Sequence, residues 1–270
     1  MKYSFMSFSC PQLTFIELLA TAKRFGYDGV EPRIDAEHQH GVETAASAAQ
    51  RKEIKKLSYT HGIALACIAT SCVYADPEIT RQNVEYTLKC IDLAADVGAE
   101  RIRVFGGTLA KGQKHSDAVK IVADALRSVA EHALARGVTV CMETHDSWCR
   151  PADVAAVLHR VNHPAVAANW DIMHPVRVHQ TPIDEAFNTL KPWIRHLHVH
   201  DGKPGSTDLM PIGQGGIDHE RAVELLLTIP YQGYLSGEWI SWSIPYEEHL
   251  PRELATLKSY ERAAADAATR

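Results

Sequence analysis

The stretch ITRQNVEYTLKCIDLAADVGAERIRVFGG, residues 79–107, contains the pattern that decides the fold. Residues 79–98 carry apolar side chains at helical spacing and end at Gly98, a residue suited to closing a helix. Residues 100–107 follow as a short apolar run, which is typical of a strand buried on both faces. A helix, a glycine and then an apolar strand form one unit of a parallel α/β fold.

This unit recurs along the whole chain. A helical segment again gives way to an apolar one at Gly26, Gly62 and Gly137. Strands and helices alternate eight times, at roughly 34 residues per pair, which is near the usual value for an α/β barrel. An open doubly wound sheet usually carries a G-x-G-x-x-G turn after its first strand, whereas that turn here reads SFSCPQL (7–13). We therefore expect a single (β/α)8 TIM-barrel domain over residues 1–270.

The expected elements follow from this alternation and from the glycine and proline positions that bound each segment. In chain order they are strand 2–8, helix 11–26, strand 27–34, helix 44–62, strand 63–70, helix 79–98, strand 100–107, helix 116–136, strand 137–143, helix 151–161, strand 165–171, helix 183–190, strand 194–201, helix 218–228, strand 233–239 and helix 246–267. Pro11 is expected in the first turn of the first helix.

Composition excludes several classes of function. The formal net charge is −5 and the basic residues are scattered, which disfavours nucleic acid or an anionic membrane surface as the main partner. No apolar run approaches the roughly 20 residues of a membrane helix, and the first ten residues lack the apolar core of a secretory signal. The six cysteines form no C-x-x-C pair and no disulfide-framework spacing. A reduced, cytoplasmic protein is therefore expected.

Residues suited to a metal lie on four consecutive expected strands. Glu143 and Asp171 each end a strand, the run RHLHVHDGK (195–203) fills the next, and Glu238 lies near the end of the last. In an α/β barrel the active site lies at this end of the strands. Two glutamates, an aspartate and a histidine form a mixed oxygen and nitrogen ligand set. Such a set favours Mn²⁺, Mg²⁺ or Co²⁺, with Zn²⁺ as the alternative.

Each of these residues also has an ordinary structural role open to it. Glu143 could be a solvated loop residue, and Asp171 could cap a helix. Glu238 stands beside Trp239 in an apolar setting where an unpaired carboxylate is costly, which favours a ligand or a paired group. The coincidence of four such groups on adjacent strands favours the metal site.

The histidine run leaves open which histidine would bind. Strand geometry puts His196, His198 and His200 on one face, toward the barrel interior, at different depths. A histidine inside a strand is often a hydrogen-bonded core residue. The pattern alone favours His200, which is nearest the mouth.

Five motifs resemble those of a known family, the xylose-isomerase-like TIM-barrel superfamily of sugar phosphate isomerases and epimerases. That superfamily includes ketose 3-epimerases, inosose isomerases and dehydratases, and endonuclease IV. The motifs occur in the expected order along the whole chain: METHD (142–146), NWDIMH (169–174), HLHVHDGK (196–203), GQGGID (213–218) and YLSGEW (234–239).

The resemblance implies a role for each matching residue. The implied metal ligands are Glu143, Asp171, His198 and Glu238. His198 is selected because the family's liganding histidine stands three residues before an acid, here Asp201.

The resemblance also implies substrate contacts and an assembly. His174 matches a substrate-contacting histidine of the family, and His200 is expected at the rim, touching substrate or a metal ligand. Where the epimerases place a substrate-binding arginine, this chain offers Lys203, and His219 replaces a familiar tryptophan. Family members commonly form homodimers or homotetramers, so a homo-oligomer is expected.

Sugar epimerisation and isomerisation begin with removal of a C–H proton next to a carbonyl. A divalent cation stabilises the resulting enediolate as a Lewis acid, while carboxylates remove and deliver protons. Glu143 and Glu238 are the expected catalytic pair, acting on a keto-sugar or a related polyol in carbohydrate metabolism. Trp239 could offer an aromatic wall to the sugar, and Glu31, at the end of strand 27–34, could contact it.

Three other functions remain as alternatives. β-Elimination uses the same first step, so a metal-dependent lyase or dehydratase acting on inosose or a 3-keto-glycoside is the first. A non-catalytic barrel that binds a metal or a sugar is the second. A phosphodiesterase of the endonuclease IV type is disfavoured, because it needs further histidines and the expected strand 63–70 has none.

Overall fold

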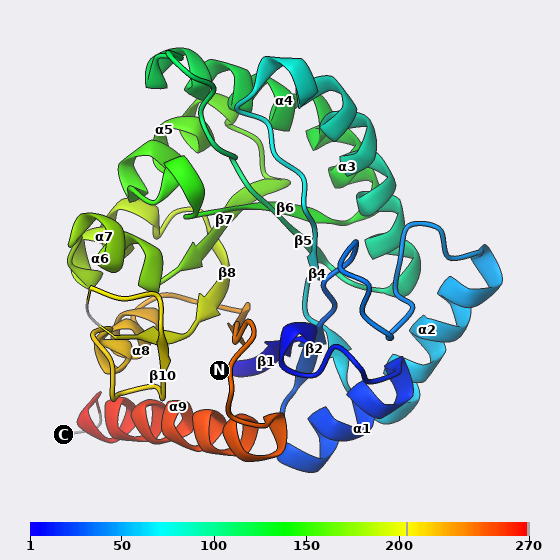
Figure 1. Cartoon of the computed structure of the whole chain (residues 1–270), viewed down its shortest axis with the longest axis vertical. Coiled ribbons are helices and arrows are strands. Elements are labelled where there is room, and N and C mark those ends of the chain that lie inside the picture. The colour runs from blue at the N-terminus through cyan, green and yellow to red at the C-terminus, as the bar shows by residue number, and fades with distance from the viewer. Residues whose placement is uncertain (204, 269–270) are drawn as a thin grey trace.

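The computed structural model, which describes residues 1–203 and 205–268, is a barrel of short parallel strands surrounded by helices (Figure 1). The expected (β/α)8 architecture is confirmed. The strands of the central sheet in the described residues are β1 (Lys2–Met6), β2 (Gly29–Glu31), β3 (Ala64–Leu65), β4 (Ile68–Ala69), β5 (Arg101–Val104), β6 (Thr139–Glu143), β7 (Val166–Asp171), β8 (Ile194–Val199) and β11 (Tyr234–Gly237).

The order of the strands closes the sheet into a ring. Neighbours run β3-β2-β1-β11-β8-β7-β6-β5-β4, and every pair is parallel. The two ends of this order, β3 and β4, are consecutive pieces of one stretch of chain. Counted as one interrupted strand, they give the eight positions of the expected barrel.

The interruption corrects the expected continuous strand 63–70. Its first half pairs with β2, and its second half pairs with β5. The chain bends between the two halves, and a bridge between Arg33 and Ala69 completes the ring. The amide of Ile34 donates to the Ala69 carbonyl at 3.0 Å, and the Ala69 amide donates to the Pro32 carbonyl at 3.0 Å. One straight strand could not serve both neighbours at this seam.

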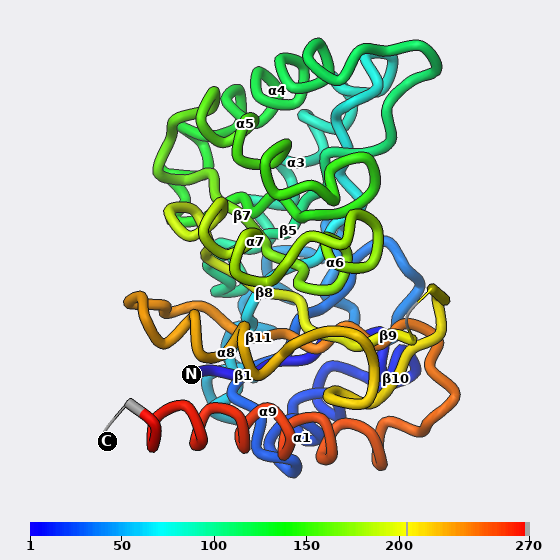
Figure 2. The backbone as a smooth tube through the Cα atoms, turned by 90° about the vertical axis from the view of Figure 1, so that its left-hand side faces the viewer, coloured from blue at the N-terminus to red at the C-terminus, as the bar shows by residue number. Residues whose placement is uncertain are grey.

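Helices form the outer layer, and most follow a strand as expected. Figure 2 shows the last helix, α9, lying beside α1 and α8 at one side of the barrel. No helix in the described ranges is long and apolar enough to cross a membrane. The α-helices of this part of the chain are α1 (Phe15–Phe25), α2 (Ala48–His61), α3 (Pro77–Val97), α4 (His115–Arg136), α5 (Pro151–Val161), α6 (Met173–His179), α7 (Ile183–Leu190), α8 (His219–Leu227) and α9 (Tyr246–Ala268).

Local sequence explains where the helices begin and end. Gly26 and Gly98 adopt the left-handed conformation, with φ of 83° and 87°, and end α1 and α3 as predicted. The predicted start of the first helix at Pro11 is wrong. The Thr14 side chain accepts from the Glu17 amide, and the Glu17 carboxylate accepts from the Thr14 amide, so this reciprocal cap sets the first turn at Phe15.

A helix and a pair of short strands near the site were not predicted from the sequence. The helix α6 begins two residues after β7, and a short antiparallel pair, β9 (Asp201–Gly202) and β10 (Leu209–Met210), follows β8. Both lie in connections at the carboxyl ends of barrel strands. Pro175 lies in the first turn of α6, where proline is tolerated because its missing N–H has no partner to lose.

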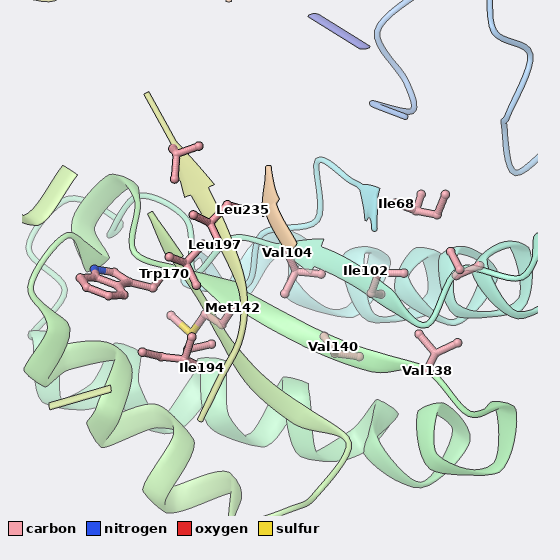
Figure 3. Close-up of a cluster of buried hydrophobic side chains, with 14 of the residues drawn as sticks. Ile68, Ile102, Val104, Val138, Val140, Met142, Trp170, Ile194, Leu197 and Leu235 are labelled. Atoms are coloured by element: carbon pink, nitrogen blue, oxygen red, sulfur yellow. The ribbon is translucent and has the colours of Figure 1, made fainter. Parts of the chain in front are cut away.

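The apolar side chains of the strands pack between the barrel and its helices. In Figure 3, Ile102 on β5, Val140 on β6 and Leu197 on β8 belong to one buried cluster. Trp170 belongs to it too, and its ring lies 6.1 Å from that of Phe187 on α7, so it is a core residue. This packing leaves the alternate, inward-facing positions of the strands free for polar groups.

Candidate metal centre

The structure brings together the four residues expected to hold a metal. Glu143 and Asp171 end β6 and β7, His198 lies near the end of β8, and Glu238 follows β11 directly. One possible ligand atom from each lies within 4.8 Å of all the others. Three of the side chains are fully buried, and Glu238 is 5% exposed. The four neighbouring strands β6, β7, β8 and β11 therefore form one site at the mouth of the barrel.

His198 lies at the centre of this site. Its Nδ1 is 3.0 Å from Glu143 Oε1 and 3.0 Å from Glu238 Oε2, while its Nε2 is 3.1 Å from Glu31 Oε1. A neutral imidazole has one donor and one acceptor nitrogen. With the donor directed at Glu31, the Nδ1 lone pair faces two carboxylate oxygens. A cation placed among these three atoms would satisfy all of them.

The pKa values of His198 and Glu238 also indicate that this cluster of carboxylates favours a positive charge. Burial lowers the pKa of His198, but Glu31, Glu143 and Glu238 outweigh it and raise that pKa well above its usual value. Burial raises the pKa of Glu238, and the opposing charge of His198 brings it down to about 2. Glu238 Oε2 nevertheless has no aligned hydrogen-bond partner. A buried carboxylate oxygen without a partner is costly, so the donor set fits a hard divalent cation.

Asp171 is both a potential ligand and the start of α6. Its Oδ1 accepts from the amides of Met173 and His174, at 2.8 and 3.0 Å. Its Oδ2 lies 2.8 Å from His200 Nε2 and 3.8 Å from His174 Nε2. Burial raises the pKa of Asp171, but the two histidines outweigh it and lower that pKa below its usual range. The amides at the start of α6 therefore use Oδ1, and Oδ2 faces the two histidines.

Glu31 lies below the cluster, and the structure does not place it at the substrate pocket. Its side chain is fully buried, and its oxygens lie 2.7 Å from His196 Nε2 and 3.1 Å from His198 Nε2. Both oxygens are thus occupied by imidazoles. Glu31 therefore lies against His196 and His198 inside the barrel and is not among the residues that line the pocket.

An open pocket of about 160 Å³ lies over the cluster. Its polar lining includes His145, His174, Arg177, His200 and Glu238. The expected substrate-contacting histidines, His174 and His200, therefore lie at this pocket. The ring of His145, from the METHD motif, is 4.5 Å from that of His174.

Two other expected substrate residues lie elsewhere. Lys203 lines a neighbouring cavity with Gln180 and Ile217, so Arg177 is the cation at the pocket. Trp239 is 1% exposed and lines a different cavity, described below. Adjacent residues of an extended chain direct their side chains to opposite faces, and the Trp239 ring packs over Gly237, away from Glu238.

Sequence reasoning missed a buried cation beside the cluster, Arg103. Its Nε lies 3.0 Å from Glu143 Oε2 as an ion pair without an aligned hydrogen bond, and its side chain is 1% exposed. Its Nη1 donates to the Thr70 carbonyl at 2.6 Å, and its guanidinium lies over the Phe105 ring at 4.0 Å. The signal was present: an arginine in the middle of an apolar strand needs a buried partner.

The glycine-rich stretch after β8 is organised by Asp201. Its carboxylate accepts from the amides of Gly202, Gly213, Gly215 and Ile217 at 2.9–3.1 Å. These donors are therefore used inside the protein and do not form a phosphate cradle. A Cβ on Gly215 would lie 2.2 Å from Asp201 Oδ1, which explains the glycine. His219 closes the same region, with Nε2 3.2 Å from the His200 carbonyl.

A closed parallel barrel with carboxylates and imidazoles at the carboxyl ends of its strands defines the class of this protein. The chain belongs to the xylose isomerase-like TIM-barrel family, whose model matches residues 19–260. It is 27% identical over 238 residues to the L-ribulose-5-phosphate 3-epimerase UlaE of Shigella flexneri serotype 5b (strain 8401), covering 83% of this chain and 82% of that protein.

Solved structures share the fold. An L-ribulose 3-epimerase aligns with a TM-score of 0.82 at 18% identity, covering 100% of this chain and 97% of the other. The probable 3-DHS dehydratase AsbF of Bacillus anthracis aligns with a TM-score of 0.79 at 19% identity, covering 96% and 99%. Proteins with this fold thus include sugar epimerases and a protein described as a dehydratase.

Proposed function

We propose that this protein is a divalent-metal-dependent sugar epimerase or isomerase that acts on a keto-sugar or a related polyol. The observation that carries the proposal is the position of His198 Nδ1, 3.0 Å from a carboxylate oxygen of Glu143 and of Glu238. The similarity to a curated 3-epimerase over most of both chains supports the same chemistry. Mn²⁺, Mg²⁺ or Co²⁺ suits the mixed ligand set, with Zn²⁺ as the alternative. The residues that would hold the ion are Glu143, Asp171, His198 and Glu238.

When bound, a divalent cation polarises a substrate carbonyl as a Lewis acid and so makes the neighbouring C–H more acidic. A carboxylate of this chain then removes that proton, and a second one returns a proton to the other face. Glu143 and Glu238 suit this pair because β6 and β11 stand on opposite sides of β7 and β8 in the sheet. Inversion at carbon needs bases on both faces.

The pocket walls supply the remaining contacts. His174, His200 and Arg177 line it, and their N–H groups can donate to sugar hydroxyls and to the carbonyl. Asp171 fixes two of these groups: it pairs with His200, and its Oδ1 accepts from the His174 amide.

Solvent deuterium exchange tests the proposal directly. The Mn²⁺-loaded protein is incubated in D₂O with a panel of keto-sugars, inosose and 3-keto-glycosides, and label at carbon is read by mass spectrometry. We expect exchange into at least one keto-sugar with its carbon skeleton retained, and strong loss of exchange in Glu143→Gln. The matched control is Glu85→Gln, which changes an exposed carboxylate on α3. Undiminished exchange in Glu143→Gln would contradict proton transfer by the pair Glu143 and Glu238.

A metal-dependent dehydratase or lyase of the same family is the second candidate. The observation that favours it is that Glu238 lines the pocket, whereas Glu143 does not. Elimination needs one base at the α-carbon and an acid at the leaving group, so a single pocket-facing carboxylate would suffice. The same experiment separates the lyase from the epimerase, because a lyase removes water or an aglycone from the substrate, whereas an epimerase retains both.

A further inference from the structure

A second and larger cavity lies beside the pocket over the cluster. It measures about 580 Å³, against about 160 Å³ for the pocket itself. Ile240 lines both, and Glu238 and Trp239, adjacent in the chain, line one each. Ligand sites in proteins usually measure about 300–1,000 Å³. The pocket at the cluster is below this range, whereas the neighbouring cavity is within it.

The lining of this cavity combines aromatic faces with polar edges. Phe8, Trp239 and Trp242 contribute rings, and Glu37 and His38 contribute polar groups. The two indoles lie nearly parallel, 19° apart, with centroids separated by 6.5 Å. Aromatic faces contact the C–H faces of sugar rings, while carboxylate and imidazole groups bind their hydroxyls. No lysine or arginine lines the cavity, so it is unsuited to a phosphate.

Unused polar atoms lie in the same lining. Trp239 Nε1, His249 Nδ1 and Ser9 Oγ are buried and have no hydrogen-bond partner within the described protein. Buried polar groups normally find partners, and these three atoms belong to residues that line the cavity.

Backbone strain gathers there as well. Glu37 and Ser241, which line the cavity, have φ of 56° and 52°, in the left-handed region that non-glycine residues rarely adopt. Such strain persists where the surrounding structure requires it, and it concentrates at functional sites. The two loops therefore hold these side chains in place at a cost.

We propose that this cavity is a subsite for an uncharged sugar ring, or a ring of similar size, joined to the keto-sugar that reacts over the cluster. The inference rests on the proposed function and deepens it. The substrate class becomes a keto-glycoside or keto-disaccharide, instead of a free keto-sugar. The shared residue Ile240 marks the border between the reacting ring and the second ring.

Binding without turnover tests the subsite apart from the chemistry. Metal-free protein is titrated with glucose, cellobiose, maltose, trehalose, phenyl β-D-glucoside and glucose 6-phosphate, and Kd is measured by calorimetry. We expect at least one of the two-ring probes to bind about tenfold tighter than glucose, because a stacked ring adds roughly this much affinity. Glucose 6-phosphate should gain nothing. Equal affinities for glucose and all the two-ring probes would overturn the inference.

Substitutions in the lining locate the effect. Trp242→Ala and Phe8→Ala should each remove most of the gain for the two-ring probe. Tyr59→Ala, which truncates an aromatic side chain that is 89% exposed on α2, should retain it. Trp242→Phe should restore part of the gain if Trp242→Ala merely loosens the loop. A gain that survives both truncations would place the second ring elsewhere and refute the subsite.

The exchange assay keeps the two proposals distinguishable. Tight two-ring binding without deuterium exchange into any keto-sugar would refute the proposed chemistry and leave the subsite standing. Exchange into free keto-sugars as fast as into keto-glycosides, with no gain in binding, would refute the subsite and leave the proposed chemistry standing.

Discussion

Glu143 and Glu238 lie at the same distance from His198 Nδ1, 3.0 Å, but the protein holds them in different ways. Glu143 is fully buried and its second oxygen faces Arg103, which is itself fixed by the Thr70 carbonyl. Glu238 lines the open pocket, and its Oε2 pairs with His198 Nδ1. Glu143 therefore has a buried guanidinium beside it, whereas Glu238 faces the pocket.

The two glutamates are thus suited to different tasks, binding the ion and transferring a proton. A ligand must stay in place, and an ion pair with a buried guanidinium achieves this. A base must approach the substrate, and only Glu238 of the two lines the pocket. We therefore infer that Glu143 contributes more to holding the ion and Glu238 more to moving the proton.

The largest expected effect comes from Glu238→Gln. Removing the pocket-facing base should lower deuterium exchange by about 10²–10⁴-fold at saturating Mn²⁺, the usual worth of a general base. Glu143→Gln should lower exchange less at saturating Mn²⁺ but raise the Kd for Mn²⁺ more. Exchange rates and calorimetric Mn²⁺ titrations of both variants provide the measurement. Equal losses of exchange and of affinity in the two variants would show that the glutamates are equivalent.

The second effect tests the pairing of Glu143 with Arg103. Arg103→Leu leaves Glu143 as a buried carboxylate without its cation, which should lower the free energy of unfolding by about 3–5 kcal/mol in urea denaturation. Added Mn²⁺ should recover part of this loss, because the ion binds only the folded protein.

Two controls accompany Arg103→Leu. Arg81→Leu removes an arginine whose side chain is 91% exposed and should change stability by less than about 0.5 kcal/mol. The double variant Arg103→Leu/Glu143→Leu should be more stable than Arg103→Leu alone, since no charge is left unpaired. If Arg103→Leu unfolds like the parent protein, Glu143 does not depend on it.

The two sides of the site also differ in how much the sequence revealed. Alternating apolar segments and helix-ending glycines predicted the barrel, and the barrel places all strand ends on one rim. That rule alone brought Glu143, Asp171 and Glu238 together. Alternation along β8 then turned His198 inward, although the family pattern was needed to choose it over His200.

What the sequence did not predict depends on contacts between distant segments. Arg103 and Glu143 pair across two strands, and Glu31 reaches His198 from a strand 167 residues earlier. Side-chain partners of this kind leave no periodic trace. The break between β3 and β4 is set by closure of the ring, which no local pattern records.

The third effect concerns the loop on the Glu238 side. His40 lies in the connection after β2, and burial lowers its pKa to about 4. Its ring is fixed by the Arg33 carbonyl at 3.1 Å and by the Val42 amide at 3.0 Å. The unfolded chain takes up this proton below about pH 6.5, whereas the folded protein does so only below about pH 4. Stability is therefore complete above pH 6.5 and falls by about 3 kcal/mol between pH 6.5 and pH 4.

Urea denaturation at pH 7 and at pH 4.5 measures this loss. His40→Gln has no group that titrates in this range, so it should lose about 2–3 kcal/mol less than the parent on acidification. On acidification, hydrogen exchange should show that the loop around His40 opens before β6 does. The strand β6, which carries Glu143, contains no histidine whose pKa is lowered by burial. An identical pH dependence in parent and variant would remove His40 as the cause.

The smallest effect comes from below the cluster, where Glu31 faces His198 Nε2 at 3.1 Å. With an ion bound, this contact would hold the ring proton on Nε2 and leave Nδ1 to bind the ion. Glu31→Gln weakens that preference, because an amide is a poorer acceptor than a carboxylate. We expect the Kd for Mn²⁺ to rise about 10–100-fold, as for other groups that orient a metal-binding histidine.

The exchange rate at saturating Mn²⁺ should change much less than the affinity in Glu31→Gln, since neither proton-moving carboxylate is altered. Nitrogen-15 NMR of metal-free protein reads the protonation of the ring nitrogens independently of activity. Glu53→Gln, at an exposed position on α2, is the matched control and should leave both readings unchanged. An unchanged Kd in Glu31→Gln would mean that Glu143 and Glu238 position His198 without support from below. The difference between the two glutamates would then depend on Arg103 alone.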